Sequence, residues 1–77
     1  LMVYLTQYIE EQEPDGEPAV VSRTRQQIYE ETGISIKTLN RTIRKMKTEG
    51  VIGIRKGKIS LTREQYEGMK EFLKNNP

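Results

Sequence analysis

Four cationic side chains between residues 37 and 45 have the types and the spacing to bind a polyanion. If the segment is a helix, which turns by about 100° per residue, Lys37, Arg41, Arg44 and Lys45 project from one side of it, together with Thr48. Ammonium and guanidinium groups donate charge-assisted hydrogen bonds to phosphate oxygens, and an arginine fork also fits the acceptor edge of guanine. We call these four cations the basic face.

The opposite side of the same segment is apolar. Leu39, Ile43 and Met46 lie within about 60° of one another on a helix, so they form a stripe suited to burial. One side of this helix is therefore predicted to pack in a core while the basic face stays in water. The residues that flank the stripe are Ile36, Asn40 and Lys47.

The charges of the chain are segregated along its length. Residues 1–20 hold five acidic side chains and no Lys or Arg, whereas residues 21–63 hold eleven Lys or Arg and three Glu, a net charge of +8. Residues 64–77 hold three Glu and two Lys, and the whole chain has a net charge of +2. A segregated basic segment is typical of a protein that binds a polyanion, although a solvated surface rich in lysine gives the same charge count.

The composition argues against several classes of function. The 77 residues include no Cys and no His, which removes disulfides, thiol nucleophiles, the usual zinc sites and the commonest general base. No GxxxxGKS or GxxxxGKT phosphate loop occurs, and scattered Glu, Lys and Tyr side chains are the only candidate acids and bases. No apolar run approaches the ~20 residues that span a bilayer, and no secretory signal is seen. We therefore expect a cytoplasmic, non-enzymatic domain with no membrane segment, metal site or cofactor of its own.

The chain is predicted to open with a helix, a loop and a short extended run. Residues 1 to about 12 have apolar residues at helical spacing, and "EPDGEP" at residues 13–18 ends this helix with two prolines and a glycine. "AVV" at residues 19–21 is prone to form a strand. The apolar residues of the first helix are Leu1, Leu5, Tyr8 and Ile9.

Two helices joined by a tight turn are predicted next. Ser22 or Thr24 can cap the first helix, Gly33 ends it, and Ser35 can cap a second helix over about residues 35–48. Two helices joined by so short a turn must cross steeply, as in a helix-turn-helix. The inward residues expected on the first of these helices are Ile28 and Tyr29.

The segment "VIGIRKGKISL" predicts a β-hairpin with a positive tip. Its apolar residues alternate so that four of them share one face, while Arg55 and Lys58 flank a Lys56-Gly57 turn. Gly53, inside the first strand, indicates a bulge or a close approach of another backbone segment. The four residues of the shared face are Ile52, Ile54, Ile59 and Leu61.

A last amphipathic helix is predicted after the hairpin. Thr62 and Gln65 have the spacing of a capping box at its start, and the helix is expected to end between Asn75 and Pro77. Its apolar residues are Tyr66, Met69, Phe72 and Leu73.

These elements together predict the fold class. The order helix, helix-turn-helix, hairpin, helix indicates an α+β fold that is mostly helical: a winged helix-turn-helix with a short β-hairpin wing over residues 54–59 and a C-terminal helix. One domain over residues 1–77 accommodates all of them. Because Leu1 opens the chain inside a helix, we expect a fragment of a longer protein.

The segment over residues 24–61 resembles the C-terminal DNA-binding domain of the cyclic-AMP receptor protein and fumarate-nitrate regulator (Crp/Fnr) family of bacterial transcription regulators. Thr24-Arg25-Gln26 is similar to the start of that family's first motif helix, and Gly33-Ile34-Ser35 to its turn. Thr38 and Arg41 resemble residues of its recognition helix, and "EGVI" followed by "GKISL" resembles its wing.

The resemblance implies roles for particular residues in sequence-specific binding of double-stranded DNA. Phosphate contacts are implied for Thr24, Gln26, Ser35 and Thr38, and a guanine contact in the major groove for Arg41. The full set expected to read bases is Ile36, Lys37, Asn40 and Arg41. The full set expected to contact phosphates is Thr24, Arg25, Gln26, Ser35, Thr38, Arg44, Lys45, Arg55, Lys56 and Lys58.

The sequence also departs from the family's pattern. Tyr29 stands where the motif prefers a small residue, which predicts slightly separated motif helices. Ile36 and Lys37 replace the arginine and glutamate that some members use for base contacts, so no operator sequence can be transferred from the family.

The resemblance also implies partners. We expect a homodimer in the full-length protein, RNA polymerase as a candidate partner, and an effector of a separate sensor domain whose identity the sequence leaves open. The alternative is a winged-helix interaction module that docks an acidic protein on its basic face.

Overall fold

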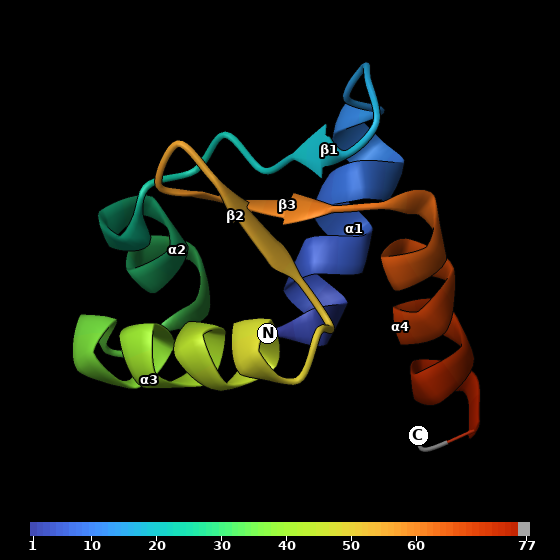
Figure 1. Cartoon of the computed structure of the whole chain (residues 1–77). Helices are drawn as coiled ribbons and strands as arrows, with labels where there is room; N and C mark the ends of the chain where they lie inside the picture. The colour runs from blue at the N-terminus through green and yellow to red at the C-terminus, as the bar shows by residue number, and fades with distance from the viewer. Residues whose placement is uncertain (76–77) are drawn as a thin grey trace.

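The computed structural model describes residues 1–75, which form four helices and three strands (Figure 1). The order of these elements confirms the predicted winged helix-turn-helix, mostly helical, with a hairpin wing and a C-terminal helix. Within this range no helix is long and apolar enough to cross a membrane. The elements are α1 (Met2–Gln12), β1 (Ala19–Val20), α2 (Arg25–Thr32), α3 (Ile36–Thr48), β2 (Gly53–Arg55), β3 (Lys58–Leu61) and α4 (Arg63–Asn75).

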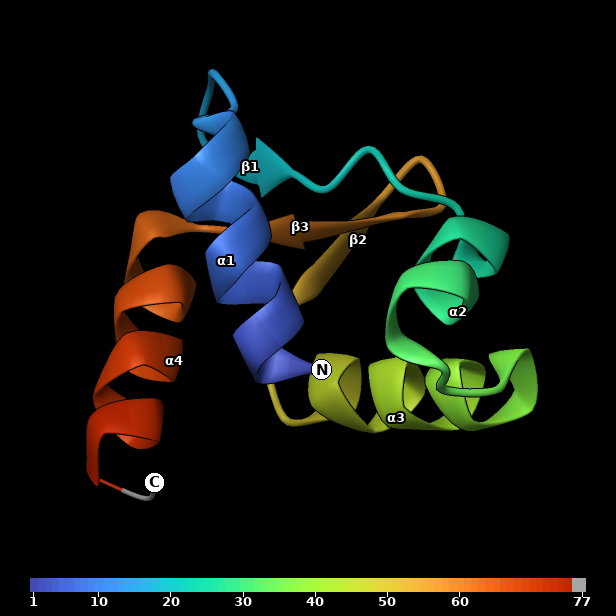
Figure 2. The ribbon, with the colours of Figure 1, turned by 180° about the vertical axis from the view of Figure 1, so that it is seen from behind.

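Every helix and the sheet contribute to one hydrophobic core. Figures 1 and 2 show α1 against one face of the sheet, with α4 beside α1. Helices α2 and α3 pack on each other at the other side of the molecule from α4. The predicted stripe of α3 is confirmed, since its three residues are all buried. The buried apolar residues are Leu5, Val21, Ile28, Leu39, Ile43, Met46, Ile52, Ile59, Leu61 and Met69.

The sheet has the strand order β1-β3-β2, and both pairings are antiparallel. The predicted hairpin is confirmed, with Ile54 opposite Ile59 and Arg55 opposite Lys58. Lys56 and Gly57 have φ angles of 51° and 79°, the left-handed conformation that a two-residue type I′ turn requires. The strand-prone run after the first loop pairs with β3, a partner that the sequence pattern did not identify.

Hydrogen bonds from three side chains outside the core fix the start of α4. The predicted capping box is confirmed, because the Gln65 N–H donates to the Thr62 hydroxyl (3.1 Å) and the Thr62 N–H to the Gln65 side-chain oxygen (2.9 Å). The Gln65 amide nitrogen also donates to the Gly50 carbonyl (3.1 Å), and the Glu17 carboxylate accepts from the Arg63 N–H (2.9 Å). Helix α4 is therefore tied both to the end of α3 and to the loop after α1.

Two residues predicted to face the core do not do so. Tyr29 is 43% exposed, because α2 is short and reaches the core with Ile28 alone. Phe72 is 52% exposed, since α4 buries Met69 and turns Phe72 toward a surface groove. Helix α4 is described to Asn75, and the other predicted end points, residues 76 and 77, lie outside the described residues.

A Cβ atom at Gly53 is expected to destabilise the hairpin, and loss of the Ser60 hydroxyl to relieve most of that effect. An ideal Cβ at this position would lie 2.8 Å from Ser60 Oγ, and Ser60, directly opposite on β3, is only 6% exposed. Overpacking typically costs about 1–3 kcal/mol. Gly53→Ala should therefore lower the free energy of unfolding in urea by about this amount, and Gly53→Ala combined with Ser60→Ala by much less.

Gly68→Ala is the matched control. Gly68 lies inside α4, and a Cβ there would meet nothing within 4 Å, so alanine should stabilise the chain by about 0.5–1 kcal/mol. If Gly53→Ala is as harmless as Gly68→Ala, or if Ser60→Ala restores nothing, the close approach of the two strands does not constrain the hairpin.

Candidate nucleic-acid interface

The first motif helix, α2, begins with a capping box. The Thr24 hydroxyl accepts from the Gln27 N–H (3.0 Å), and the Gln27 side chain accepts from the Thr24 N–H (2.9 Å). These bonds confirm Thr24 as the cap. The other end of α2 is closed by Gly33, whose φ of 78° lies in the left-handed region that favours glycine and whose N–H donates to the Tyr29 carbonyl (2.8 Å).

The turn between α2 and α3 comprises residues 33–35 and is held by two hydroxyl groups. Thr32 donates to the Ile28 carbonyl (2.7 Å) and accepts from the Ile34 N–H (3.1 Å). The Ser35 hydroxyl accepts from the Thr38 N–H (3.2 Å) and donates to the Thr38 hydroxyl (3.0 Å). The predicted Ser35 cap is confirmed, so the sequence fixes where α3 starts.

The two helix starts each present backbone N–H groups with no partner in residues 1–75. A helix leaves its first N–H groups without intrahelical acceptors, and the caps satisfy only part of each set. The open groups belong to Arg25 and Gln26 on α2 and to Ile36 and Lys37 on α3. Together with the positive end of each helix dipole, they suit the binding of phosphate oxygens.

The exposed surface of α3 carries the predicted basic face. Its four cations are exposed, whereas Leu39, Ile43 and Met46 on the other side of the helix are buried. Among residues 1–75 the one ion pair joins Arg23 to Glu31 (3.2 Å), so the cations of α3 have no carboxylate partner there. The exposed cations of α3 are therefore available to bind an external polyanion.

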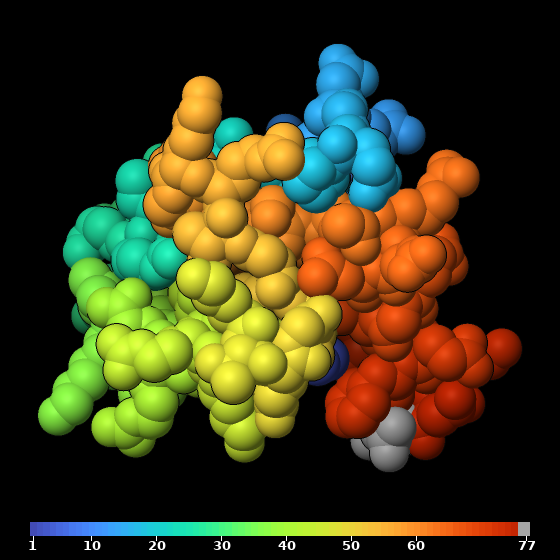
Figure 3. All heavy atoms as spheres, viewed as in Figure 1, coloured from blue at the N-terminus to red at the C-terminus, as the bar shows by residue number. Residues whose placement is uncertain are grey.

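The elements that carry the predicted site residues are visible together on one face of the molecule. Figure 3 shows the start of α2, the length of α3 and the hairpin next to one another on the visible face. All fourteen residues expected to contact DNA are exposed except Arg25 and Lys58, which are partly buried. Their contact with DNA stays a prediction.

A network that the sequence analysis missed fixes α1 against α2. The Tyr4 hydroxyl donates to the Glu31 carboxylate (3.2 Å), which also pairs with Arg23. Burial is the main cause that raises the pKa of Tyr4, and the negative charge of Glu31 raises it further. Tyr4 and Glu31 lie 27 residues apart, so no local spacing could have revealed their contact.

A second tyrosine joins α4 to α1. The Tyr66 hydroxyl donates to the Glu10 carboxylate (3.0 Å), and the Lys70 ammonium lies 5.2 Å from the centre of the Tyr66 ring. Burial is again the first cause that raises the pKa of this tyrosine, followed by the hydrogen bond to Glu10. The acceptor of Tyr4 is therefore an acid of α2, and the acceptor of Tyr66 is an acid of α1.

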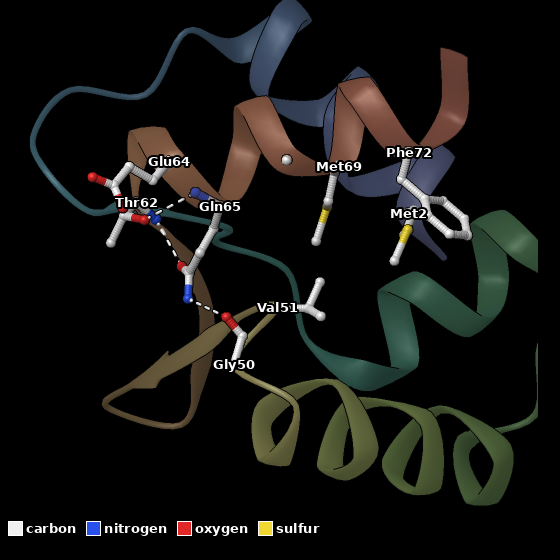
Figure 4. Close-up of a pocket in the computed structure, with 9 residues that line it drawn as sticks. Met2, Gly50, Val51, Thr62, Glu64, Gln65, Met69 and Phe72 are labelled. Atoms are coloured by element: carbon white, nitrogen blue, oxygen red, sulfur yellow. Dashed lines mark hydrogen bonds between the residues drawn. The ribbon is translucent and has the colours of Figure 1, made fainter. Parts of the chain in front are cut away.

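A groove of about 510 Å³ lies at the opposite end of α3 from the predicted base-reading residues. Figure 4 shows Met2, Val51, Met69 and Phe72 around it, with the Gln65 side chain bridging Thr62 and Gly50 at its polar edge. Glu64 is the one ionisable side chain among its lining residues. A single exposed carboxylate supplies no acid–base pair, so this groove adds no candidate catalytic chemistry.

A family model described as a Crp-like helix-turn-helix domain matches residues 1–70, which include all four helix starts and the hairpin. The comparisons with curated proteins and with solved structures gave no match.

The Tyr4 network leads to a prediction about pH. Because the folded pKa of Tyr4 is raised above the ordinary value near 10, folding favours its neutral form. Its contribution to stability is therefore present below about pH 10 and is lost as the pH rises through the higher folded pKa. Glu31→Gln should lower the pKa of Tyr4 toward 10, though not fully, since burial remains the largest cause. Tyrosine ring resonances followed by NMR between pH 8 and 12 would measure the shift.

Glu30→Gln, on the neighbouring and exposed position of α2, is the matched control and should leave Tyr4 unchanged. Tyr66 serves as an internal control, because its acceptor is Glu10. A Tyr4 pKa that ignores Glu31→Gln, or that moves equally with Glu30→Gln, would contradict the network.

Proposed function

This chain belongs to the family of Crp-like helix-turn-helix domains, which bind DNA in transcription regulators, and from that premise we propose that α3 is its recognition helix and reads double-stranded DNA in the major groove. The observation that carries this proposal is the basic face of α3, exposed and without carboxylate partners in residues 1–75. A helix of about 10–12 Å diameter fits a major groove about 12 Å wide.

The proposed contacts divide into base reading and backbone positioning. The first turns of a recognition helix meet base edges, which assigns Ile36, Lys37, Asn40 and Arg41 to the groove floor. The starts of α2 and α3 lie beside the groove and offer open N–H groups to the flanking phosphates. The residues proposed to contact phosphates around these helices are Thr24, Arg25, Gln26, Ser35, Thr38, Arg44 and Lys45.

The hairpin is proposed to act as the wing. Its tip carries Arg55, Lys56 and Lys58 beside an I′ turn, and the hairpin shares the visible face of Figure 3 with the start of α2 and with α3. Cations on a short, exposed turn can lie along a phosphate backbone without reaching base edges, so the wing should supply affinity and little sequence information.

We also propose that the chain acts as the DNA-reading unit of a dimeric regulator in the cytoplasm. One recognition helix reads one half-site, and regulators of this architecture commonly pair two copies on half-sites about 34 Å apart. RNA polymerase and an effector-binding domain are proposed partners of such a regulator. The rival proposal is that the basic face docks an acidic protein. Salt-dependent binding to a DNA duplex distinguishes DNA reading from this alternative.

Arg41→Ala is expected to flatten sequence specificity. Arg41 projects from the basic face, and a bidentate arginine–guanine pair is worth about 1–3 kcal/mol of discrimination. Binding of the parent and the variant would be measured on a duplex selected from a random library and on a scrambled duplex. The ratio of the two dissociation constants should fall by about five- to 150-fold.

Arg63→Ala is the matched control, because Arg63 is an exposed arginine at the start of α4 and outside the proposed interface. An unchanged ratio in Arg41→Ala would assign Arg41 to phosphate or solvent. Absence of salt-dependent binding to any duplex by the parent chain would instead favour the protein-docking alternative.

Neutralising the wing is expected to weaken binding equally on all sequences. Each phosphate contact contributes a slope of about −0.9 to the plot of log K against log salt concentration. Lys56→Ala with Lys58→Ala should therefore reduce the magnitude of this slope by about two. Titrations between 50 and 200 mM salt, monitored by fluorescence anisotropy, would measure it.

Lys70→Ala with Lys74→Ala removes the same charge from α4 and serves as control for net charge. Equal slopes in the wing variant and the α4 variant would exclude the wing from the interface.

A further inference from the structure

We propose that Ile36 recognises the C5-methyl group of a thymine in the half-site that α3 reads. The inference rests on the proposed function, because it names a base feature contacted by the same helix. Ile36 is the first residue of α3, directly after its cap, and is 38% exposed. In residues 1–75 the large hydrophobic side chains that are exposed are Val3, Tyr29, Ile36 and Phe72.

The exposure of Ile36 follows from its place at the end of the buried stripe. At about 100° per residue, Ile36 points within about 20° of the direction of Ile43. Ile43 is nevertheless only 5% exposed, because it lies two turns further along α3, over the core. The apolar stripe therefore continues beyond the core to Ile36, in the first turn of α3, which also carries Lys37. This is the end of α3 that is proposed to enter the groove.

The side chain of Ile36 limits what it can recognise there. It has no hydrogen-bond donor or acceptor, so it cannot read the N7, O6, N6 or O4 atoms that distinguish bases through hydrogen bonds. The thymine methyl is the one apolar feature that an unmodified base pair presents in the major groove. Contact between this methyl and Ile36 would remove apolar surface of both from water.

The neighbours of Ile36 support a mixed half-site. Asn40 and Arg41 lie one turn further along α3 and are exposed. Asparagine pairs with adenine and arginine with guanine through major-groove atoms, whereas Ile36 can add only the methyl contact. The half-site is therefore expected to contain a thymine near the guanine that Arg41 contacts.

A structural role for Ile36 is the competing explanation, since single exposed hydrophobic residues are common and this one could simply cover the turn before α3. The two explanations differ in one respect. A covering residue affects all duplexes alike, whereas a methyl-reading residue affects only duplexes that carry the methyl at one position.

The test uses the 77-residue chain and a duplex selected from a random library. Each thymine of the selected half-site would be replaced in turn by deoxyuridine, which differs from it only by the methyl group. At one position the parent should lose about threefold to fourfold in affinity, the factor expected for one buried methyl-sized group. Ile36→Ala should lose a similar factor on the thymine duplex and no longer distinguish the two bases, whereas Ile36→Val should retain most of the distinction.

Val3→Ala is the matched control, because Val3 is also an exposed aliphatic residue but lies on α1; this variant should keep the full deoxyuridine penalty. If Ile36→Ala weakens thymine and deoxyuridine duplexes alike, or still distinguishes them at every position, the inference is overturned while the proposed function stands. If the parent selects no preferred sequence at all, the proposed function fails and this inference with it.

Discussion

Burial of Leu39, Ile43 and Met46 is the interaction on which the rest of the structure depends. Burying one such side chain stabilises a fold by about 1.5–3 kcal/mol, whereas an exposed ion pair contributes about 0–1 kcal/mol. The apolar stripe, and not the charges, therefore fixes the rotation of α3 about its own axis. A rotation by one residue would turn α3 by about 100° and carry part of the basic face into the core. Because the stripe forbids this, the cations of α3 must point outward.

The basic face stays open because the acids of the chain are engaged elsewhere or lie on other elements. Glu17 accepts from the backbone at the start of α4, where a carboxylate also complements the helix dipole. Glu10 accepts from Tyr66, and Glu31 holds both Tyr4 and Arg23. The segregation of charge along the sequence thus becomes a division in space: acids fasten α1, α2 and α4 to one another, while α3 keeps a surface of one sign. A surface of one sign raises the local concentration of a polyanion and speeds its association.

The end of α3 connects this surface to the wing. The Val51 N–H donates to the Met46 carbonyl (2.9 Å) and the Gly50 N–H to the Lys47 carbonyl (3.0 Å), the paired bonds that commonly close a helix at glycine. The Gly50 carbonyl then accepts from Gln65, so α3, the hairpin and α4 meet at one point. The hairpin register follows from the I′ turn at one end and from the close approach of Gly53 to Ser60 at the other. Helix and wing therefore hold a defined relation through backbone bonds and packing, with no contribution from the charges that they carry.

The sequence by itself determined the features that depend on neighbours along the chain. Helix periodicity, the caps at Ser35 and Thr62, the helix stop at Gly33 and the Lys56-Gly57 turn all involve residues within a few positions of one another, and each was predicted correctly. For the first motif helix the sequence left Ser22 and Thr24 as alternative caps, and the structure selects Thr24. The division of α3 into a buried stripe and a basic face followed from the same periodicity. The sequence did not reveal contacts between distant segments, such as the pairing of β1 with β3 and the hydrogen bond from Tyr4 to Glu31. For the same reason it did not reveal that Tyr29 and Phe72 are exposed. Periodicity gives the direction in which a side chain points, but only the tertiary structure decides whether another element lies there to cover it. For the same reason the sequence could name Ile36 as a base-reading candidate, while only the fold showed that α3 carries it beyond the core.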